Sequence, residues 1–409
     1  MTKNHQSHNV IKCNSINKVK SIDLYRHEKT ENNISSYLTG LQPIIKWPGG
    51  KEKELKYIIP NIPNFENFYE PFVGGGAVFM AINAKEYYIN DFSSELISLY
   101  KYIATSNKEF FDYIERINSS WNNASIFFKS NLTLVDTYIK YRNEIISKDD
   151  LKIYIQKYCK ERIDDVLNII GKEFSSYSCI LPKEIEINLF RKMTRMNAIE
   201  REKTYLSKKD INDNIETAIK SAVYMNYRHM YNCKDIAQTN KPLYCALFFF
   251  IRNYSYSGMF RYSSKGDFNV PYGGIAYNNK YLIKKIKYYN TKTLIDHFDS
   301  AHIYNLDFEA FLRKTNPTEK DFVFLDPPYD SEFSNYAQNE FTFKDQERLA
   351  DYMINRCKAK WMMIIKYTDF IYSLYNQKGI KIRTFEKEYL VSFMNRNDKK
   401  ATHLLITNY

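Results

Sequence analysis

The strongest constraint on the fold is a segment in which a short apolar stretch runs into three consecutive glycines and then into a helical pattern. Residues 67–72 read as a strand, Val73–Gly76 as a turn and residues 77–82 as the start of a helix. A second strand, residues 87–89, ends shortly before Asp91. The order strand, glycine turn, helix, strand and acid predicts the beginning of a doubly wound parallel sheet.

The same alternation of strands and helices returns near the end of the chain. The further elements that we expect are a helix at 95–103, strands at 302–304, 322–325 and 360–365, a helix from Thr342 to about Arg356, and terminal strands at 381–386 and 402–407 around a polar turn at 395–400. The predicted fold class is therefore α/β, a doubly wound Rossmann-like sheet with a terminal β-hairpin.

The chain between these two α/β parts has a different character. It is long, charged and poor in glycine, with apolar residues at helical spacing, and it ends in a stretch rich in Gly, Ser, Tyr and Arg. We therefore expect residues 41–103 and 286–409 to form one domain. Residues 104–285 form a largely helical insertion with a functional hairpin at 253–274, and residues 1–40 a polar, disordered arm.

Composition excludes several classes of protein. The longest apolar run, Tyr244–Ile251, is too short to span a bilayer, and the first forty residues lack a signal peptide, so we expect a soluble, cytoplasmic protein. The six cysteines form no CxxC pair, and the histidines show no metal-ligand spacing, so we expect neither a disulfide framework nor a metal site. The net charge of +12 suits a nucleic-acid partner, although an AT-rich coding sequence gives the same composition.

The sharpest chemical signal is Asp326-Pro327-Pro328-Tyr329, directly after the apolar strand at 322–325. Ligands of open α/β sheets bind at the carboxyl ends of the strands, where this carboxylate would lie. The prolines remove two N–H donors and leave carbonyl acceptors, and the tyrosine adds a ring. Such a group of residues suits a flat ligand that carries an NH2 group. The alternative is an acidic strand end followed by a proline-stiffened turn.

Two glycine-containing turns complete the pattern. Asp91 follows Gly76 by 15 positions, at the next strand end, where an acid can bind ribose hydroxyls. The glycine turn lacks the Gly-Lys-Ser/Thr of a phosphate-binding loop, so an adenosine-bearing cofactor is favoured over a phosphoryl donor. Upstream, ahead of a helix that we expect to begin near Glu52, Lys46–Lys51 joins an aromatic residue, two glycines and a lysine, which suits a small zwitterionic ligand. Either motif alone is equally well explained as an ordinary turn.

Together these motifs resemble the amino-methylating DNA methyltransferases of the deoxyadenosine methylase (Dam) type, the alpha group in motif order. The matching segments are Ile45–Lys51 (cofactor-wrapping motif), Glu70–Gly76 (S-adenosylmethionine motif), Asn253–Gly274 (recognition segment), Asn305–Phe308 (adenine-ring contact), Asp326–Tyr329 (catalytic motif) and Leu404–Tyr409 (final strand). The resemblance covers about residues 41–103 and 246–409. It implies a methyltransferase sheet with a target-recognition insertion.

The resemblance also implies roles for single residues. The implied catalytic residues are Asp326, Pro327, Pro328 and Tyr329. Cofactor contacts are implied for Trp47, Lys51, Glu70, Phe72, Gly74, Gly76, Asp91, Asp307, Phe308 and Asp326. DNA contacts are implied for Tyr256, Ser257, Arg261, Lys265 and Asn269. Pro48 departs from the family pattern, as do Ser257 and Ser263, which replace asparagines, and the helical insertion is longer than in Dam itself.

The implied function is a site-specific DNA adenine-N6 methyltransferase that takes a methyl group from S-adenosylmethionine and acts on an adenine flipped out of duplex DNA. The long insertion suggests a longer or asymmetric target, as in restriction-modification systems. A cognate restriction endonuclease would then be a separate chain, and we expect a monomer. Two alternatives stay open: an RNA base N-methyltransferase, and a catalytically silent DNA-binding module.

Overall fold

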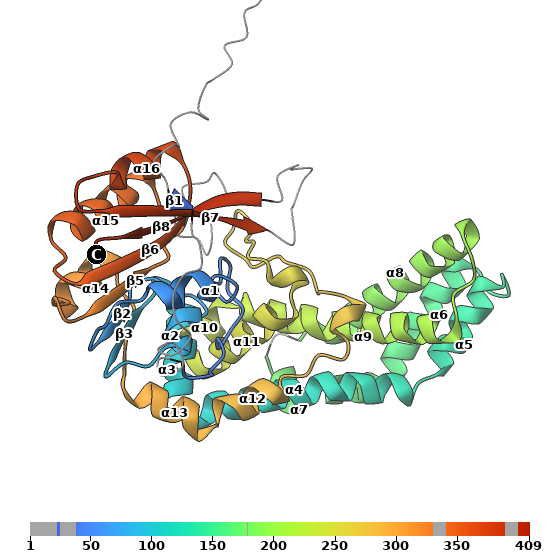
Figure 1. Cartoon of the computed structure of the whole chain (residues 1–409). Coiled ribbons are helices and arrows are strands. Elements are labelled where there is room, and N and C mark those ends of the chain that lie inside the picture. Colours follow the sequence, from blue (N-terminus) through green and yellow to red (C-terminus); the bar gives the residue numbers. More distant parts are fainter. Residues whose placement is uncertain (1–22, 25–37, 178, 330–340, 389–399) are drawn as a thin grey trace, which may run out of the picture.

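The computed structural model of the chain describes residues 23–24, 38–177, 179–329, 341–388 and 400–409. Its centre is an eight-stranded sheet with the order β1-β7-β8-β6-β5-β2-β3-β4 (Figure 1). The strands are β1 Asp23–Leu24, β2 Phe68–Glu70, β3 Tyr87–Asn90, β4 Ala301–Tyr304, β5 Phe322–Leu325, β6 Lys360–Lys366, β7 Lys381–Glu388 and β8 Lys400–Thr407. Neighbouring strands are parallel except around β8, which runs antiparallel to both β6 and β7.

Helices cover both faces of this sheet, as a doubly wound fold requires. They are α1 Leu55–Ile58, α2 Ala77–Ala81, α3 Ser94–Ala104, α12 Ile283–Tyr289, α13 Lys292–Asp299, α14 Phe308–Thr315, α15 Phe343–Asn355 and α16 Asp369–Tyr375. Strand β5 explains the two layers: Phe322 and Phe324 join the apolar core on one face, and Val323 and Leu325 join the core on the other. A strand buried on both faces lies at the centre of the fold, so the residue that follows it emerges at a central edge of the sheet.

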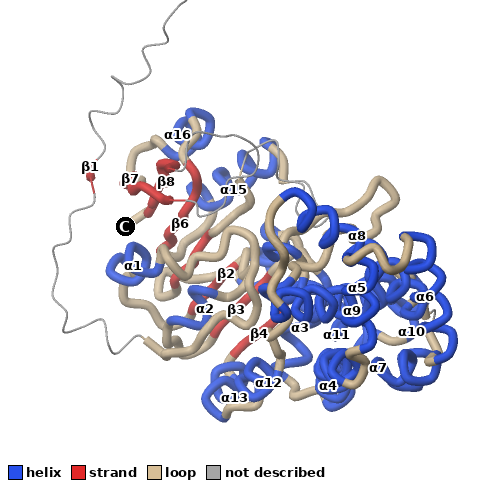
Figure 2. Tube along the Cα trace, turned by 90° about the vertical axis from the view of Figure 1, so that its right-hand side faces the viewer, coloured by secondary structure: helices blue, strands red, loops and turns tan. Residues whose placement is uncertain are grey.

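The insertion is an elongated bundle of eight helices among the described residues (Figure 1). They are α4 Lys108–Lys129, α5 Thr133–Arg142, α6 Lys148–Glu161, α7 Ile163–Ser175, α8 Leu181–Glu202, α9 Lys208–Tyr231, α10 Lys234–Thr239 and α11 Lys241–Tyr254. Figure 2 shows the same bundle from the side, next to the sheet. Helices α4 and α9 extend away from the sheet, and α5, α6 and α8 lie at the far end.

Most predicted elements are confirmed. Strand β5 has the predicted bounds, Thr342 caps α15 in a capping box with Asp345, and β7 and β8 form the terminal hairpin. The polar turn at 395–399 and most of the arm at 1–40 lie outside the described residues. In the arm, β1 pairs in parallel with β7, and Leu38 forms a bridge with Ile82.

Three local predictions differ from the structure. Strand β2 ends at Glu70 because Pro71 has no N–H to donate to a neighbouring strand. The helix expected near Glu52 begins at Leu55, after a turn. The expected hairpin at 253–274 has no regular ladder: its two sides meet only at the isolated bridges Ser255–Tyr272 and Tyr262–Phe268. A positive φ of 52° at Ser257 and the missing N–H of Pro271 interrupt the pairing.

Candidate active site

The site is built around Asp326, which leaves the carboxyl end of β5. Its Oδ1 atom lies 2.5 Å from Nζ of Lys51, whose side chain is 2% exposed, whereas that of Asp326 is 19% exposed. The Lys51 ammonium also donates to the Gly49 carbonyl (2.8 Å) and to the Tyr329 hydroxyl (3.4 Å). One buried cation therefore joins the predicted wrapping motif to both ends of the predicted catalytic motif.

Two residues that the sequence analysis did not single out, Gln346 and His403, contact the catalytic motif. The side-chain amide of the fully buried Gln346, in α15, donates to the Pro328 carbonyl at 2.8 Å. The Tyr329 hydroxyl lies 3.3 Å from Nε2 of His403, a buried residue of β8. Because Pro328 has a fixed φ and a bonded carbonyl, the segment that follows Asp326 is held in one conformation. Neither residue belongs to a motif, so only the structure identifies them.

Two further carboxylates, Glu70 and Asp91, lie near Asp326. Glu70 is 2% exposed and accepts a hydrogen bond from the Phe79 N–H at 3.1 Å. Burial raises the pKa of Glu70 well above its usual value, and the charge of Asp326 adds to this effect. Burial also raises the pKa of Asp91 to about 6. The site thus contains three carboxyl groups and, in Lys51, a cation that partly offsets them.

The glycine turn is packed directly against the wrapping motif. Asp91 accepts a hydrogen bond from the Gly74 N–H at 3.0 Å, which fixes the start of the turn. A Cβ atom at Gly74 would lie 3.0 Å from Trp47 Cδ1, and a Cβ at Gly75 would lie 2.5 Å from the Ile45 carbonyl oxygen. At Gly76, φ is +79° and a Cβ would meet the Tyr100 hydroxyl at 2.4 Å. No side chain fits this turn, so the predicted residues Trp47, Gly74 and Gly76 form one close-packed unit.

A cluster of aromatic rings lies beside the ends of β2 and β4. Phe72 and Phe308 are 5.7 Å apart between ring centroids, and Phe341 lies 5.7 Å from each. The carboxylate of Asp307, predicted to contact the cofactor, caps α14 and forms two hydrogen bonds, of 2.9 and 2.8 Å, with Arg348. The Arg348 guanidinium also covers the Phe308 ring at 4.5 Å. Sequence reasoning missed Arg348, which orients both predicted residues.

The five predicted DNA-contacting residues lie in one irregular hairpin. Tyr256 is 48% exposed, next to Ser257 with its left-handed backbone. Nε of Arg261 donates to Oδ1 of Asn269 at 2.6 Å, so these two residues are brought together across the hairpin. Lys265 is exposed near the tip. The hairpin therefore presents an aromatic ring and two cations to its surroundings.

Helix α9 anchors this hairpin to the insertion. The Tyr224 hydroxyl and the Arg228 guanidinium both donate to the Val270 carbonyl, at 2.9 and 3.1 Å. Asn232 both accepts from the N–H of Phe268 and donates to its carbonyl, at 2.9 and 3.0 Å. Side-chain hydrogen bonds of this kind replace the missing strand ladder, so the hairpin depends on the helical bundle for its position.

A second buried cation connects the hairpin to the wrapping motif. Arg252, in the last turn of α11, is 3% exposed and donates to the carbonyls of Met259 (2.9 Å) and Lys46 (3.4 Å). Its guanidinium covers the Phe260 ring at 3.4 Å and lies 5.6 Å from the centre of the Trp47 ring. Burial lowers the pKa of Arg252 to about 9. Arg252 thus joins the wrapping motif to the hairpin.

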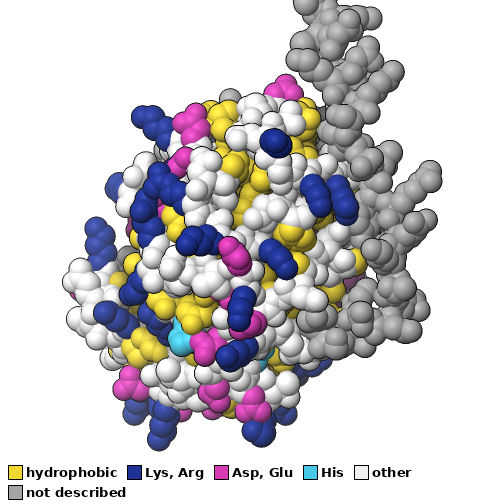
Figure 3. All heavy atoms as spheres, turned by 60° about the vertical axis from the view of Figure 1, so that its left-hand side comes forward, with side chains coloured by type: hydrophobic (Ala, Val, Ile, Leu, Met, Phe, Trp, Pro, Cys, Tyr) yellow, Lys and Arg dark blue, Asp and Glu magenta, His cyan; other side chains and the backbone are white. Residues whose placement is uncertain are grey.

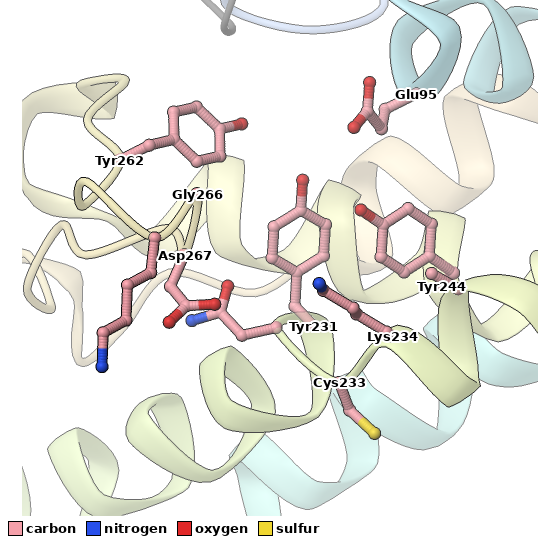
Figure 4. Close-up of a pocket in the computed structure, with 11 residues that line it drawn as sticks. Glu95, Tyr231, Cys233, Lys234, Tyr244, Tyr262, Gly266 and Asp267 are labelled. Carbon is pink, nitrogen blue, oxygen red and sulfur yellow. The ribbon is translucent and has the colours of Figure 1, made fainter.

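A pocket separates the tip of the hairpin from α3 (Figure 4). Glu95 and Tyr262 approach it from opposite sides, and the stacked rings of Tyr231 and Tyr244, 4.9 Å apart, lie between them. The hairpin residue Lys265 also lines the pocket. The pocket has a volume of about 150 Å³. The pocket therefore lies between the hairpin tip and the junction of α9 and α10.

Other features of the described chain concern membrane, metal and charge. No helix in the described ranges is long and apolar enough to cross a membrane. Within the same ranges, no group of three or more His, Cys, Asp and Glu side chains is arranged to hold a metal ion. On the face shown in Figure 3, Lys and Arg side chains are interspersed with Asp and Glu across the coloured surface. The excess positive charge of the chain is thus not concentrated on that face.

Comparison with known proteins gives matches over most of the chain. A family model described as "D12 class N6 adenine-specific DNA methyltransferase" matches residues 47–391. The Type II methyltransferase M.CviBI of Paramecium bursaria Chlorella virus NC1A is 26% identical over 90% of this chain and 100% of its own length. The Type II methyltransferase M.MjaIII of Methanocaldococcus jannaschii is 24% identical over 90% and 99%, and the DNA adenine methylase of Haemophilus influenzae is 24% identical over 84% and 86%.

These matches confirm the predicted family and favour DNA adenine over an RNA base as the substrate. They also agree with the geometry, because the matched range includes residues 47–51 of the wrapping motif, the glycine turn, the hairpin and the catalytic motif. The fold, with helices on both faces of a mostly parallel sheet and an antiparallel β8, is that of a Rossmann-like methyltransferase. The chain belongs to the D12 class N6 adenine-specific DNA methyltransferases, enzymes that transfer a methyl group to adenine in DNA.

Proposed function

We propose that S-adenosylmethionine is the methyl donor and that the residues around Asp326 bind it next to a target adenine flipped out of duplex DNA. The carboxyl groups, the glycine turn and the aromatic rings around Asp326 suit this cofactor. Besides burial, the charge of Asp326 raises the pKa of both Glu70 and Asp91, and a cationic ligand would relieve this repulsion. The glycine turn, which has no side chains, would let the ligand come close to the backbone. The rings of Phe72 and Phe308 provide an apolar surface for adenosine.

The cofactor residues divide into three groups by their contacts in the chain. Gly74 and Gly76 belong to the turn that the methionine end would approach, and Trp47 packs against this turn. Asp91 and Glu70 supply carboxyl groups, of which Asp91 also fixes the turn. Phe72, Asp307 and Phe308 would hold the adenine, with the rings making the contact because the Asp307 carboxylate is engaged by Arg348. Lys51 connects these groups to Asp326.

The catalytic step that we propose depends on Asp326 and on the Pro327 carbonyl. The bound cofactor supplies a methyl group on a sulfonium sulfur. The adenine N6 is a poor nucleophile because its lone pair is delocalised into the ring. Hydrogen bonds from N6 to the Asp326 carboxylate and the Pro327 carbonyl would favour a pyramidal amine and stabilise the positive charge that develops there. After methylation, N6 would lose one proton to solvent water, while Tyr329 and Pro328 would hold the base in place.

Residues 104–285 would read the DNA through the hairpin. Arg261, held by Asn269, either contacts guanine or binds a phosphate, and Lys265 and Ser257 contact the backbone. The exposed Tyr256 would fill the space that the flipped base leaves. Because side chains of the bundle anchor the hairpin, we propose that residues 41–103 and 286–409 carry the chemistry and the insertion carries the recognition.

Several relatives are called Type II methyltransferases, which suggests a restriction-modification system for this chain as well. In such a system the enzyme would protect its target sequence from a restriction endonuclease made as a separate chain. We propose that the enzyme acts as a monomer, since an asymmetric arrangement of one hairpin and one catalytic site needs no second copy.

The observation that carries this proposal is the ion pair between Lys51 and Asp326, which unites the wrapping and catalytic motifs. The test is single-molecule sequencing of plasmid DNA from cells that lack adenine methylation and express the wild type or Asp326→Ala. We expect N6-methyladenine at one recurrent motif in the wild type alone. Equal methylation by Asp326→Ala would refute the catalytic role, and a folded wild type that leaves the plasmid unmodified would refute the function.

A further inference from the structure

The outer face of α8 carries a row of cations far from the active site. The buried positions of this helix, such as Ile185, Leu189 and Met193, face the bundle. Arg191 and Arg195, one helical turn apart, are exposed on the opposite side, and Lys192 is half-buried beside them. We call Arg191, Lys192 and Arg195 the α8 ridge.

The ridge has no acidic counterpart. Other cations near the ends of α8 are paired: Lys183 lies 2.8 Å from Glu186, and Arg201 lies 2.6 Å from Glu144. For the three ridge residues, no salt bridge with any described residue is present. Arg191 donates only to the neutral side chain of Asn188, at 2.6 Å.

The lowered pKa of Lys192 indicates that no negative charge balances the positive charges of the ridge in the described part of the chain. Burial lowers the pKa of Lys192, and the charges of Arg191 and Arg195 lower it further. No nearby carboxylate opposes this effect in the described part of the chain. Neighbouring cations that repel one another in this way are stabilised when an anion binds beside them. The ridge therefore has the character of an anion-binding surface.

The position of the ridge relative to the hairpin follows from the helix geometry. α8 starts beside the anchored end of α9, where the Ile180 N–H donates to Asn226 at 3.0 Å. From there a rise of 1.5 Å per residue puts Arg191 and Arg195 roughly 16 and 22 Å farther out. In Figure 1 both α8 and the hairpin region lie above α9, with α4 and α7 below it.

We propose that the α8 ridge binds the phosphate backbone of the same DNA duplex whose target sequence the hairpin reads. This inference rests on the proposed function and extends it. At about 3.4 Å per base pair, the ridge would contact DNA roughly five to seven base pairs beyond the hairpin. It reads no bases: guanidinium and ammonium groups on an exposed helix contact phosphates irrespective of sequence. The insertion thus lengthens the bound duplex rather than the recognised sequence.

The test compares two variants that lose the same charge. The ridge variant carries Arg191→Gln, Lys192→Gln and Arg195→Gln, and the control variant carries Lys157→Gln, Arg162→Gln and Lys209→Gln. The control residues also lie in the insertion, but each is paired with an acid, Glu161, Asp165 or Asp213. Fluorescence anisotropy measures the Kd for a 30-base-pair target duplex at 50 to 200 mM salt in the presence of a cofactor analogue.

We expect the slope of log Kd against log salt to fall by about 1.8 to 2.7 in the ridge variant, for two or three lost phosphate contacts. Between 50 and 200 mM salt, wild-type affinity would then fall up to about 40-fold more than that of the ridge variant. The control variant should keep most of the wild-type slope. Equal slopes for the ridge and control variants would overturn the inference, because only net charge would then matter.

Duplex length provides the second measurement. On a 10-base-pair duplex that ends three base pairs from the target on the ridge side, and therefore before the ridge, the wild type and the ridge variant should bind equally. A ridge defect of the same size on short and long duplexes would also overturn the inference. Methylation at saturating DNA and low salt should stay at the wild-type rate in the ridge variant. If instead the wild type methylates no DNA, it is the proposed function that fails, which separates the two outcomes.

Discussion

The buried ion pair between Lys51 and Asp326 allows a quantitative prediction. At the observed separation of 2.5 Å, two unit charges attract each other by about 7 kcal/mol if the effective dielectric constant is 20. Much of this attraction only offsets the cost of removing both charges from water. Removing one partner leaves the other charge buried, and we therefore expect Lys51→Met to lower the free energy of unfolding by about 3 kcal/mol.

A double-mutant cycle separates the pair from the effects of each residue alone. Asp326→Asn keeps the shape of the side chain but removes its charge, and it leaves the Lys51 ammonium with neutral partners. In the double variant neither charge is buried without a partner. We expect its loss of stability to be smaller than the sum of the two single losses by about 1 to 3 kcal/mol.

Urea denaturation followed by fluorescence measures the stability of the four proteins, and incorporation of a radiolabelled methyl group measures their activity. All three variants should lose methylation, because the carboxylate and the cation both belong to the site. Restored stability without restored activity is thus the expected signature of the double variant. If the two single losses add to within about 0.5 kcal/mol, the charges are not coupled and the argument from their separation is wrong.

Four further predictions concern other parts of the site and the core. Arg252→Met should raise the KM for DNA roughly tenfold through two lost charge-assisted hydrogen bonds, with partial rescue by Arg252→Lys. Gly75→Ala, whose Cβ would lie 2.5 Å from the Ile45 carbonyl oxygen, should weaken binding of a cofactor analogue in a calorimetric titration more than Gly50→Ala, whose Cβ would lie 3.3 Å from the Trp47 carbonyl oxygen. The pKa of Asp91 is raised to about 6, so its protonated form increases as the pH falls; analogue binding should weaken from pH 7 to pH 5, and Asp91→Asn should remove this dependence. Burial lowers the pKa of His297 to about 4, so as the pH falls this histidine is protonated in the unfolded chain before it is protonated in the folded protein. The free energy of unfolding should therefore fall by about 2 kcal/mol from pH 7 to pH 5, but not in His297→Gln.

The sequence predicted those parts of the fold that depend on local patterns. Strand β5 and the cap of α15 were predicted correctly because a short apolar run and a Thr-x-x-Asp capping box determine them within a few residues. The insertion of β8 between β6 and β7 was not predicted, because strand order depends on contacts between distant segments. The hairpin was expected from its composition, but its irregular form depends on side chains of α9 that no local pattern links to it.

The site could be predicted in part for the same reason. Lys51 and Asp326, which belong to motifs of recognisable spacing, form an ion pair, and the glycine turn packs against Trp47. Their roles in cofactor binding and catalysis stay predictions. Gln346, Arg348 and Arg252 were missed because each occupies an ordinary helical position, and its role follows from a partner far away in the sequence. A buried polar residue in a helix is visible only once its surroundings are known.

Two buried cations, Lys51 and Arg252, join the catalytic, cofactor-wrapping and hairpin segments, and they do so by different physical means. Lys51 faces the carboxylate of Asp326, so its loss leaves a buried negative charge and should reduce stability. Arg252 donates to neutral backbone carbonyls, so its loss leaves no opposite charge behind. Its removal should instead change the position of the hairpin relative to the wrapping motif. A stability defect at one cation and a DNA-affinity defect at the other would show that the site needs both a balanced charge and a fixed orientation.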